Sequence, residues 1–563
     1  MGQEISIQQL LEILEDEVLE GKSKEELCSI LRRFARLQPV DKRQSFISQL
    51  KEACADEVVH EKTEESLESI ATYLESISAL KRELEERSEL IEEGRWDELD
   101  DYYYEERGYY DDYGPDYVSE QACQEADEIF TLARHKVLDG DYEFALPLCS
   151  ALIKLESEIN GVGNLCCREL GEIYCLSVFM CADESNREQA FFDAVSFVVS
   201  HLRFSSEIVD EQGQISLQNL LTILGKPFYL FLQKWKSYLN QQEDYRIANR
   251  LYAEILVIDQ EWGELELLMD KPVEEYGSAW IFSLYSMEKA EQWERLAGCC
   301  KVVLPSLNDH IYIYVATLLS KAGKKLNDTE LINEGIVLRF IYSPSKELLG
   351  ELCYFCKNLI QIRKELKKCM RAFSEKQFSR ENAVVLLLQG KLEEAYRRCG
   401  TMEALGWNSG PYGDVVCAGL VAICGNKIEL PSEVLGVLKY YYKGGCSWSN
   451  DIGVESNNYL DKLEEIIKLS MGALNLTDSE KKEWLEMFRE VTERRIEAVL
   501  DGKYRGAYNR VAQLMVAWAQ TADRIGMRNE GQGFINETMC RYRRFSAFRK
   551  EVNIIINQPL FCL

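Results

Sequence analysis

The sequence has no long hydrophobic run. Its longest strongly apolar stretch, Val415–Cys424, has ten residues, whereas a helix needs about 20 apolar residues to span a bilayer. Residues 1–30 alternate Leu and Ile with Glu and lack the apolar core of a secretion signal. We therefore expect a cytoplasmic protein without a membrane partner, in which the 19 cysteines are free thiols.

The motifs of the common catalytic and cofactor sites are also missing. There is no GxxxxGK[ST] phosphate loop, no HExxH zinc helix and no GxSxG nucleophile turn. Gly161-Val162-Gly163 lacks the third glycine of a dinucleotide loop, and the four histidines have no motif around them. From this we predict a protein that is not an enzyme and that holds no cofactor and no metal.

Cys353-Tyr354-Phe355-Cys356 is the one CxxC motif. A zinc site needs two more ligands nearby, and a redox pair needs a βαβ context. The motif lies in a helical pattern with neither feature, which favours two structural cysteines. A metal or redox site at Cys353 and Cys356 is the alternative.

Positive charge is scarce and unevenly placed. The 65 Lys and Arg against 95 Asp and Glu give a net charge of −30, which repels phosphate backbones and makes nucleic-acid binding unexpected. Residues 1–118 hold 14 basic and 32 acidic residues, a balance of −18. Residues 481–563 hold 15 basic and 10 acidic residues, a balance of +5.

Helical periodicity runs through most of the chain. Leu67, Ile70, Leu74 and Ile77 form one face of a helix predicted over about 63–93. Two β-like runs, 311–315 and 552–556, are isolated from any hairpin partner. The predicted fold is all-α, with irregular tetratricopeptide-like hairpins and smaller helical modules at both ends. The predicted segments are an acidic helical domain (1–93), an acidic Tyr-rich linker (94–120), a helical-hairpin body (121–400), a Gly-rich hinge (401–460) and a basic helical domain (461–563).

The breaks between helices in the body resemble those of tetratricopeptide units. In Gly140–Ala145 and Gly390–Ala395, a glycine is followed by a bulky side chain and then by an alanine that permits close packing. Looser versions begin at Glu243 and Glu291. Positions 140, 244, 292 and 390 share no 34-residue period, so irregular hairpins describe the pattern better than a regular array.

Glycine gathers between residues 400 and 460, which contain ten of the 34 glycines. Three stretches there, 406–413, 425–431 and 443–458, cannot all lie inside helices. Exposed loops of this kind join domains and are cut by proteases. We therefore predict a domain boundary in this region.

Two clusters of side chains are candidates for binding a protein partner. In the linker, aromatic rings among carboxylates suit a basic partner surface. Near the C-terminus, a cluster of arginines suits an acidic partner surface. The alternatives are a solvated tether for the first cluster, and a terminal helix with inward Phe545 and Phe548 for the second. The candidates are Tyr102, Tyr103, Tyr104, Tyr109 and Tyr110 in the linker, and Arg541, Arg543 and Arg544 near the C-terminus.

The overall plan resembles one CRISPR accessory family: an acidic helical chain, a helical body, and a loop-rich segment before a C-terminal module. Members of that family are the substrate of the caspase-like TPR–CHAT protease of bacterial type III-E (gRAMP) systems. The resemblance implies that an RNA-activated protease cuts the chain once, and that the N-terminal part binds a sigma factor. The cut is then expected in the Gly-rich loops, with Met402, Leu405, Gly406, Trp407, Asn426 and Lys427 as candidate residues.

Two other interpretations remain open. The chain could be a generic tetratricopeptide-like scaffold with an unrelated protein partner. It could also be an enzyme whose site is assembled from scattered Asp, Glu and Arg residues.

Overall fold

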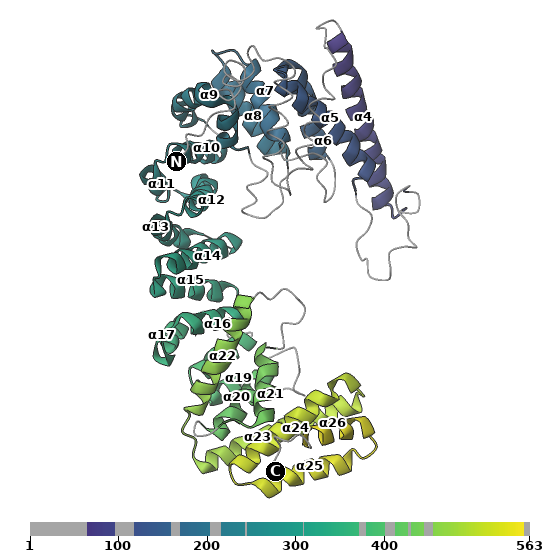
Figure 1. Ribbon diagram of the computed structural model, residues 1–563, viewed down its shortest axis with the longest axis vertical. Helices are drawn as coiled ribbons and strands as arrows, with labels where there is room; N and C mark the ends of the chain where they lie inside the picture. Colours follow the sequence, from purple (N-terminus) through teal and green to yellow (C-terminus); the bar gives the residue numbers. More distant parts are fainter. Residues whose placement is uncertain are drawn as a thin grey trace, which may run out of the picture. The chain divides into compact units, whose positions relative to one another are not determined.

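The computed structural model describes residues 65–95, 99, 117–158, 169–202, 215–242, 245–307, 309–370, 379–399, 411–425, 429–443 and 454–556. These residues form 23 α-helices, α4–α26, and no strand (Figure 1). The all-α prediction is confirmed. The two β-like runs lie within α14 and α26.

The chain divides into two compact units, Met1–Ser283 and Leu284–Leu563. Unit 1 contains α4 (Glu65–Glu92), α5 (Glu120–Leu138), α6 (Tyr142–Glu158), α7 (Leu170–Cys181), α8 (Arg187–His201), α9 (Leu217–Leu239), α10 (Tyr245–Ile258), α11 (Trp262–Leu268) and most of α12 (Val273–Lys289).

Unit 2 contains the remaining helices. They are α13 (Trp293–Val303), α14 (Asp309–Leu326), α15 (Thr329–Tyr342), α16 (Lys346–Phe355), α17 (Leu359–Cys369), α18 (Arg380–Leu388), α19 (Leu392–Arg398), α20 (Tyr412–Cys424), α21 (Ser432–Lys443), α22 (Val454–Gly472), α23 (Asp478–Asp501), α24 (Tyr508–Arg524), α25 (Arg528–Arg541) and α26 (Ser546–Ile556).

A single type of helix end recurs along the chain. At Gly140, φ is +78°, the glycine N–H donates to the Val137 carbonyl, and the next N–H donates to the Lys136 carbonyl. This is the Schellman motif, which closes a helix by satisfying its last carbonyls. Among the described residues, eight helix ends have this motif. Their left-handed residues are Gly94, Gly140, Gln260, Glu291, Asn327, Gly390, Lys503 and Gly526.

These ends explain why the hairpins are irregular. The predicted breaks at Gly140, Glu291 and Gly390 are helix ends, and Ala145 and Ala395 after two of them are fully buried. Gln260, Glu291 and Asn327 follow one another at intervals of 31 and 36 residues, near the 34-residue tetratricopeptide period. The sequence pattern did not predict the ends at Gln260 and Asn327, and Glu291 shows that the left-handed residue need not be a glycine.

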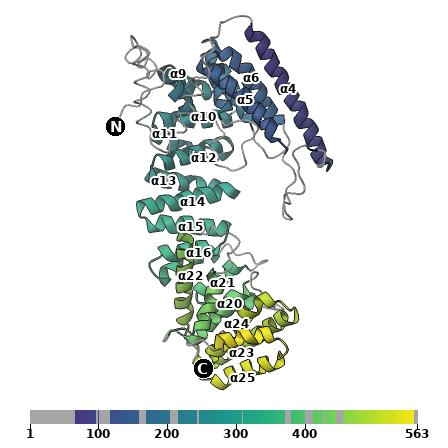
Figure 2. The ribbon, with the colours of Figure 1, turned by 45° about the vertical axis from the view of Figure 1, so that its right-hand side comes forward.

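The core of unit 1 lies between α5, α6, α7, α8 and α9. Phe191 is at its centre, with T-shaped ring contacts to Phe179, Phe228 and Trp235 at centroid distances of 5.8, 5.7 and 5.0 Å. The long helix α4 runs beside α6 and adds Ile77, Leu80 and Leu84 to the same core (Figure 2).

Among the described residues of unit 2, the buried apolar side chains of α15 to α26 form one continuous core. A single cluster of buried apolar side chains runs from Ile332 in α15 to Ile555 in α26. The region predicted to be a loop-rich hinge contains α20, α21 and the start of α22. Every residue of α20 from Tyr412 to Ile423 is buried. Helices α23–α26 therefore share their core with α16–α21.

The glycines of α20 have a packing role that their sequence pattern did not indicate. A Cβ atom at Gly413 would lie 1.9 Å from the Tyr441 ring, and one at Gly419 would lie 2.2 Å from the Phe488 ring. Both glycines thus admit an aromatic ring against the helix backbone. Two of the glycines in this region therefore serve helix packing.

Candidate functional site

The candidate cleavage residues lie at the two ends of α20. Met402, Leu405, Gly406, Trp407, Asn426 and Lys427 are all outside the described residues. The described chain stops at Cys399, resumes at Pro411, stops again at Gly425 and resumes at Glu429. The buried helix α20 therefore separates the two candidate segments, 400–410 and 426–428.

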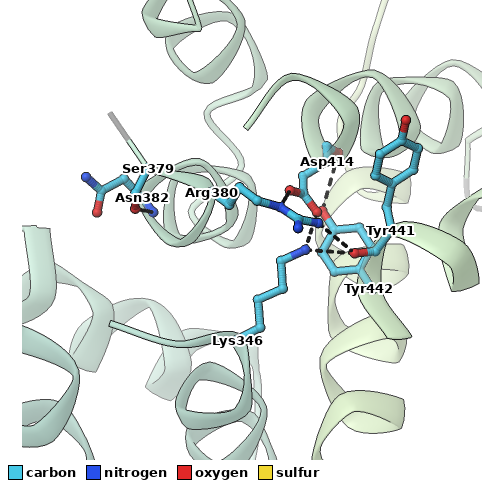
Figure 3. A network of polar contacts seen from close by, with 7 residues as sticks. All are labelled: Lys346, Ser379, Arg380, Asn382, Asp414, Tyr441 and Tyr442. Atoms are coloured by element: carbon cyan, nitrogen blue, oxygen red, sulfur yellow. Dashed lines mark hydrogen bonds and ion pairs between the residues drawn. The ribbon is translucent and has the colours of Figure 1, made fainter. Parts of the chain in front are cut away.

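A buried network of charged groups connects helices on both sides of these segments (Figure 3). Lys346 of α16 donates from Nζ to Asp414 Oδ1 and to the Tyr441 carbonyl, the latter at 2.8 Å. Arg380 of α18 donates from Nε to Asp414 Oδ2 at 2.9 Å and from Nη2 to the Tyr441 carbonyl at 3.2 Å. We call Lys346, Arg380, Asp414, Tyr441 and Tyr442 the charge network.

Local sequence places each cation at the start of a helix. Lys346 follows Ser345, whose hydroxyl accepts from the Leu348 N–H and caps α16. Arg380 follows Ser379, which caps α18 by accepting from the Asn382 N–H. The caps fix both backbones, so the two long side chains extend toward the last turn of α21 (Figure 3).

The charge network contains two cations and one carboxylate, with the Tyr441 carbonyl as a further acceptor for both cations. The Asp414 side chain is 0% exposed and that of Lys346 is 8% exposed, so neither ion is solvated by bulk water. The Tyr441 carbonyl belongs to the last turn of α21, where the helix dipole favours nearby cations. The Lys346 ammonium also lies 4.9 Å from the centre of the Tyr442 ring. Burial acts to lower the pKa of the Arg380 guanidinium, but Asp414 outweighs burial and raises it.

A cavity of about 210 Å³ adjoins the charge network, between the first turns of α16 and α18 and the end of α21. Lys346 and Arg380 line it, together with Glu347 and Glu381. Both Asp414 oxygens already accept hydrogen bonds from the two cations. Asp414 is therefore occupied as a structural anion, and the network holds four helices together.

Of the two candidate partner-binding clusters, the structure describes only the arginine cluster near the C-terminus. The five linker tyrosines, Tyr102 to Tyr110, lie outside the described residues. Arg541, at the end of α25, donates to Glu497 of α23. Arg543 and Arg544 are exposed in the turn before α26. Phe548 is fully buried and Phe545 is partly buried, as expected for a terminal helix packed on the core.

The CxxC cysteines are part of the unit 2 core. Cys353 in α16 is 0% exposed and Cys356 is 6% exposed. Burial raises the pKa of the Cys356 thiol to about 12 and that of Cys353 further still. Within the described parts of the chain, no three His, Cys, Asp or Glu side chains are grouped so as to hold a metal ion.

Sequence reasoning did not identify the charge network. Lys346 and Asp414 are 68 residues apart, and Lys346 and Tyr441 are 95 apart. One signal was available: Asp414 is the only charged residue in an otherwise apolar stretch that begins at Tyr412. A lone carboxylate on a buried helix requires a cationic partner.

Comparison of the chain with protein-family models, with curated proteins and with solved structures gives no match. Within the described ranges, no helix combines the length and apolar character needed to cross a bilayer.

Proposed function

We propose that this chain is a non-catalytic regulatory protein that acts through protein partners and is controlled by cutting at one end of α20. The resemblance to the type III-E CRISPR accessory family supports a CHAT-type protease, activated by RNA, as the enzyme that makes the cut. It also supports a sigma factor as a partner of the N-terminal fragment. On this proposal the protease cuts within one of the two candidate segments, 400–410 or 426–428.

The observation that carries the proposal is the position of α20. It is the most completely buried helix in the described part of unit 2, and the two candidate segments adjoin its ends. Proteases cut preferentially at exposed loop segments, which a buried helix does not supply. Cutting within α20 is therefore disfavoured, and cutting on either side of it is favoured.

A cut there would leave the two fragments in contact. After a cut at 426–428, the first fragment keeps α16, α18 and α20, and the second keeps α21–α26. Separation would expose the faces of α20 that pack on α21, α22, α23 and α24. Fully exposing one buried Val, Leu or Ile side chain costs roughly 1.5–3 kcal/mol, so exposing several makes spontaneous release unfavourable. On this proposal, release requires a partner that competes for the exposed faces.

Limited proteolysis tests the site of cutting. We expect a non-specific protease, at low ratio to the intact chain, to make its early cuts in unit 2 within 400–410 or 426–428, as read by mass spectrometry of the fragments. A useful comparison is 379–399, which lies close in sequence but forms α18 and α19. Early cuts within the helices α18, α19, α20 or α21 themselves would contradict the proposal. So would the absence of early cuts in both 400–410 and 426–428.

A generic tetratricopeptide-like scaffold is the second candidate. The helix ends at Gln260, Glu291 and Asn327 favour it, because their spacing approaches that of the repeat family. Affinity purification separates the two functions. Recovery of a protease or a sigma factor supports the regulatory protein, whereas stoichiometric recovery of unrelated proteins alone supports the scaffold.

A further inference from the structure

A second cavity in unit 2 lies away from the charge network. It has a volume of about 530 Å³ and is lined by the end of α14, the start of α15, the end of α16 and the first described side chains of α22. Its lining residues include Lys324, Tyr354, Phe355 and Tyr459. We call it the aromatic pocket.

One wall of the aromatic pocket is a cluster of three rings. Tyr354 contacts Phe355 and Tyr459 at centroid distances of 5.3 and 5.4 Å, both in T-shaped geometry. Phe355 and Tyr459 lie 6.4 Å apart. Tyr354 is 53% exposed, whereas a ring that served only the core would be covered. The wall therefore offers aromatic surface to an incoming group.

The ion-paired group of Lys324, Arg339 and Glu351 carries a net positive charge. Lys324 is the one charged residue that lines it among the described side chains. Its ammonium lies 2.7 Å from Glu351, and Arg339 lies 3.3 Å from the same carboxylate. Two cations thus share one buried anion, which leaves one positive charge. The Lys324 ammonium also lies 5.3 Å from the Phe355 ring centre and 5.9 Å from that of Tyr459.

The backbone around the pocket is held firmly. A Cβ atom at Gly350 would lie 2.4 Å from the Tyr459 carbonyl oxygen, so α16 and α22 meet with their backbones in contact. The Asp328 side chain caps α15 by accepting from the N–H groups of Glu330 and Leu331. A preformed pocket loses little conformational entropy on binding.

We propose that the aromatic pocket binds an acidic peptide segment of a partner protein, in which a carboxylate side chain lies next to an aromatic one. The partner's carboxylate would approach Lys324, and its ring would pack on Tyr354 and Tyr459. Aromatic anchors with one matched charge are the usual basis of such recognition. This inference goes beyond the proposed cleavage, because none of the described residues that line the pocket belongs to either candidate segment, and an uncut chain would bind the peptide.

Fluorescence polarisation with the full chain tests the proposal. The probe is a fluorescein-labelled peptide, Gly-Ser-Asp-Tyr-Asp-Phe-Ser-Gly, and its comparison peptide has Asn in place of both Asp residues. We expect saturable binding of the acidic probe and at least about fivefold weaker binding of the Asn peptide, since the attraction to one cation is lost. Raising the salt concentration should weaken the acidic probe's binding.

Two variants with matched controls locate the binding site. Tyr354→Ala removes an exposed ring and should raise the Kd about tenfold, whereas Tyr504→Ala, at a ring that is 65% exposed elsewhere in unit 2, should not change it. Lys324→Gln should raise the Kd about fivefold, because it removes the cation that attracts the probe's carboxylate. Glu351 keeps Arg339 as its partner, so the variant is expected to stay folded. Lys321→Gln, on the same helix and paired with Glu288, is its control.

Three results would overturn the proposal. They are the absence of saturable binding by the acidic probe, an equal Kd for Tyr354→Ala and the wild type, and tighter binding of a single-stranded oligonucleotide than of the acidic probe. Thermal melts of all four variants establish that each is folded before the Kd values are compared. None of these results bears on the site of cutting, so the proposed function can fail or stand separately.

Discussion

Asp414→Ala is expected to lower the free energy of unfolding by ~3–5 kcal/mol, because it leaves the buried Lys346 ammonium and the partly buried Arg380 guanidinium without their carboxylate. Lys346 and Arg380 would keep the Tyr441 carbonyl as an acceptor but lose the carboxylate that accepts hydrogen bonds from both of them. Urea unfolding of the full chain, followed by circular dichroism, measures the change. The loss should appear in the transition that reports unit 2.

A control and a rescue make this prediction specific. Asp478→Ala removes a carboxylate that is 95% exposed and pairs with Lys481 at 3.5 Å, so it should cost less than ~1 kcal/mol. Adding Lys346→Met to an Asp414→Leu chain removes one orphaned cation and should recover part of the loss. An Asp414→Ala chain as stable as the Asp478→Ala chain would show that the charge network does not hold these helices together.

Gly350→Ala should destabilise the protein, although alanine is the better helix former. The new Cβ atom would lie 2.4 Å from the Tyr459 carbonyl oxygen, and a backbone atom cannot rotate away as a flexible side chain can. Overpacking of this kind costs ~1–3 kcal/mol. The substitution forces α16 and α22 apart and can be measured by the same urea unfolding.

Gly298→Ala is the matched control for this substitution. Gly298 also lies inside a helix, α13, but a Cβ atom there would meet nothing within 4 Å. Alanine at this position should stabilise the protein by ~0.5–1 kcal/mol through helix propensity alone. The two substitutions are therefore expected to have opposite signs. A stability change of the same sign in both would refute the close helix contact.

The predictions that rest on local pattern match the structure best. The helix expected over 63–93 is α4, because its apolar spacing depends only on neighbouring residues. The breaks at Gly140 and Gly390 are helix ends, because a left-handed residue favours glycine. The ends at Gln260 and Asn327 were not predicted, because residues other than glycine at the left-handed position give a weaker local signal.

The packing of unit 2 could not be predicted from local pattern. Glycine at 413 and 419 looked like loop composition, whereas aromatic rings from Tyr441 and Phe488 require it inside a helix. The aromatic pocket likewise joins Lys324 and Tyr354 to Tyr459, more than a hundred residues further along the chain. Such contacts depend on which helices pack together, and a single sequence does not state that.

The most direct test of the account is whether a cut chain stays together. Residues 426–428 are replaced by the recognition sequence of a site-specific protease, the purified chain is cut to completion, and native mass spectrometry is recorded at micromolar concentration. We predict a one-to-one complex of the two fragments, and its partial dissociation when Asp414→Ala is added. Two free fragments from the cut chain with Asp414 intact would contradict the central claim that α20 and the charge network hold both sides of the cut in one body.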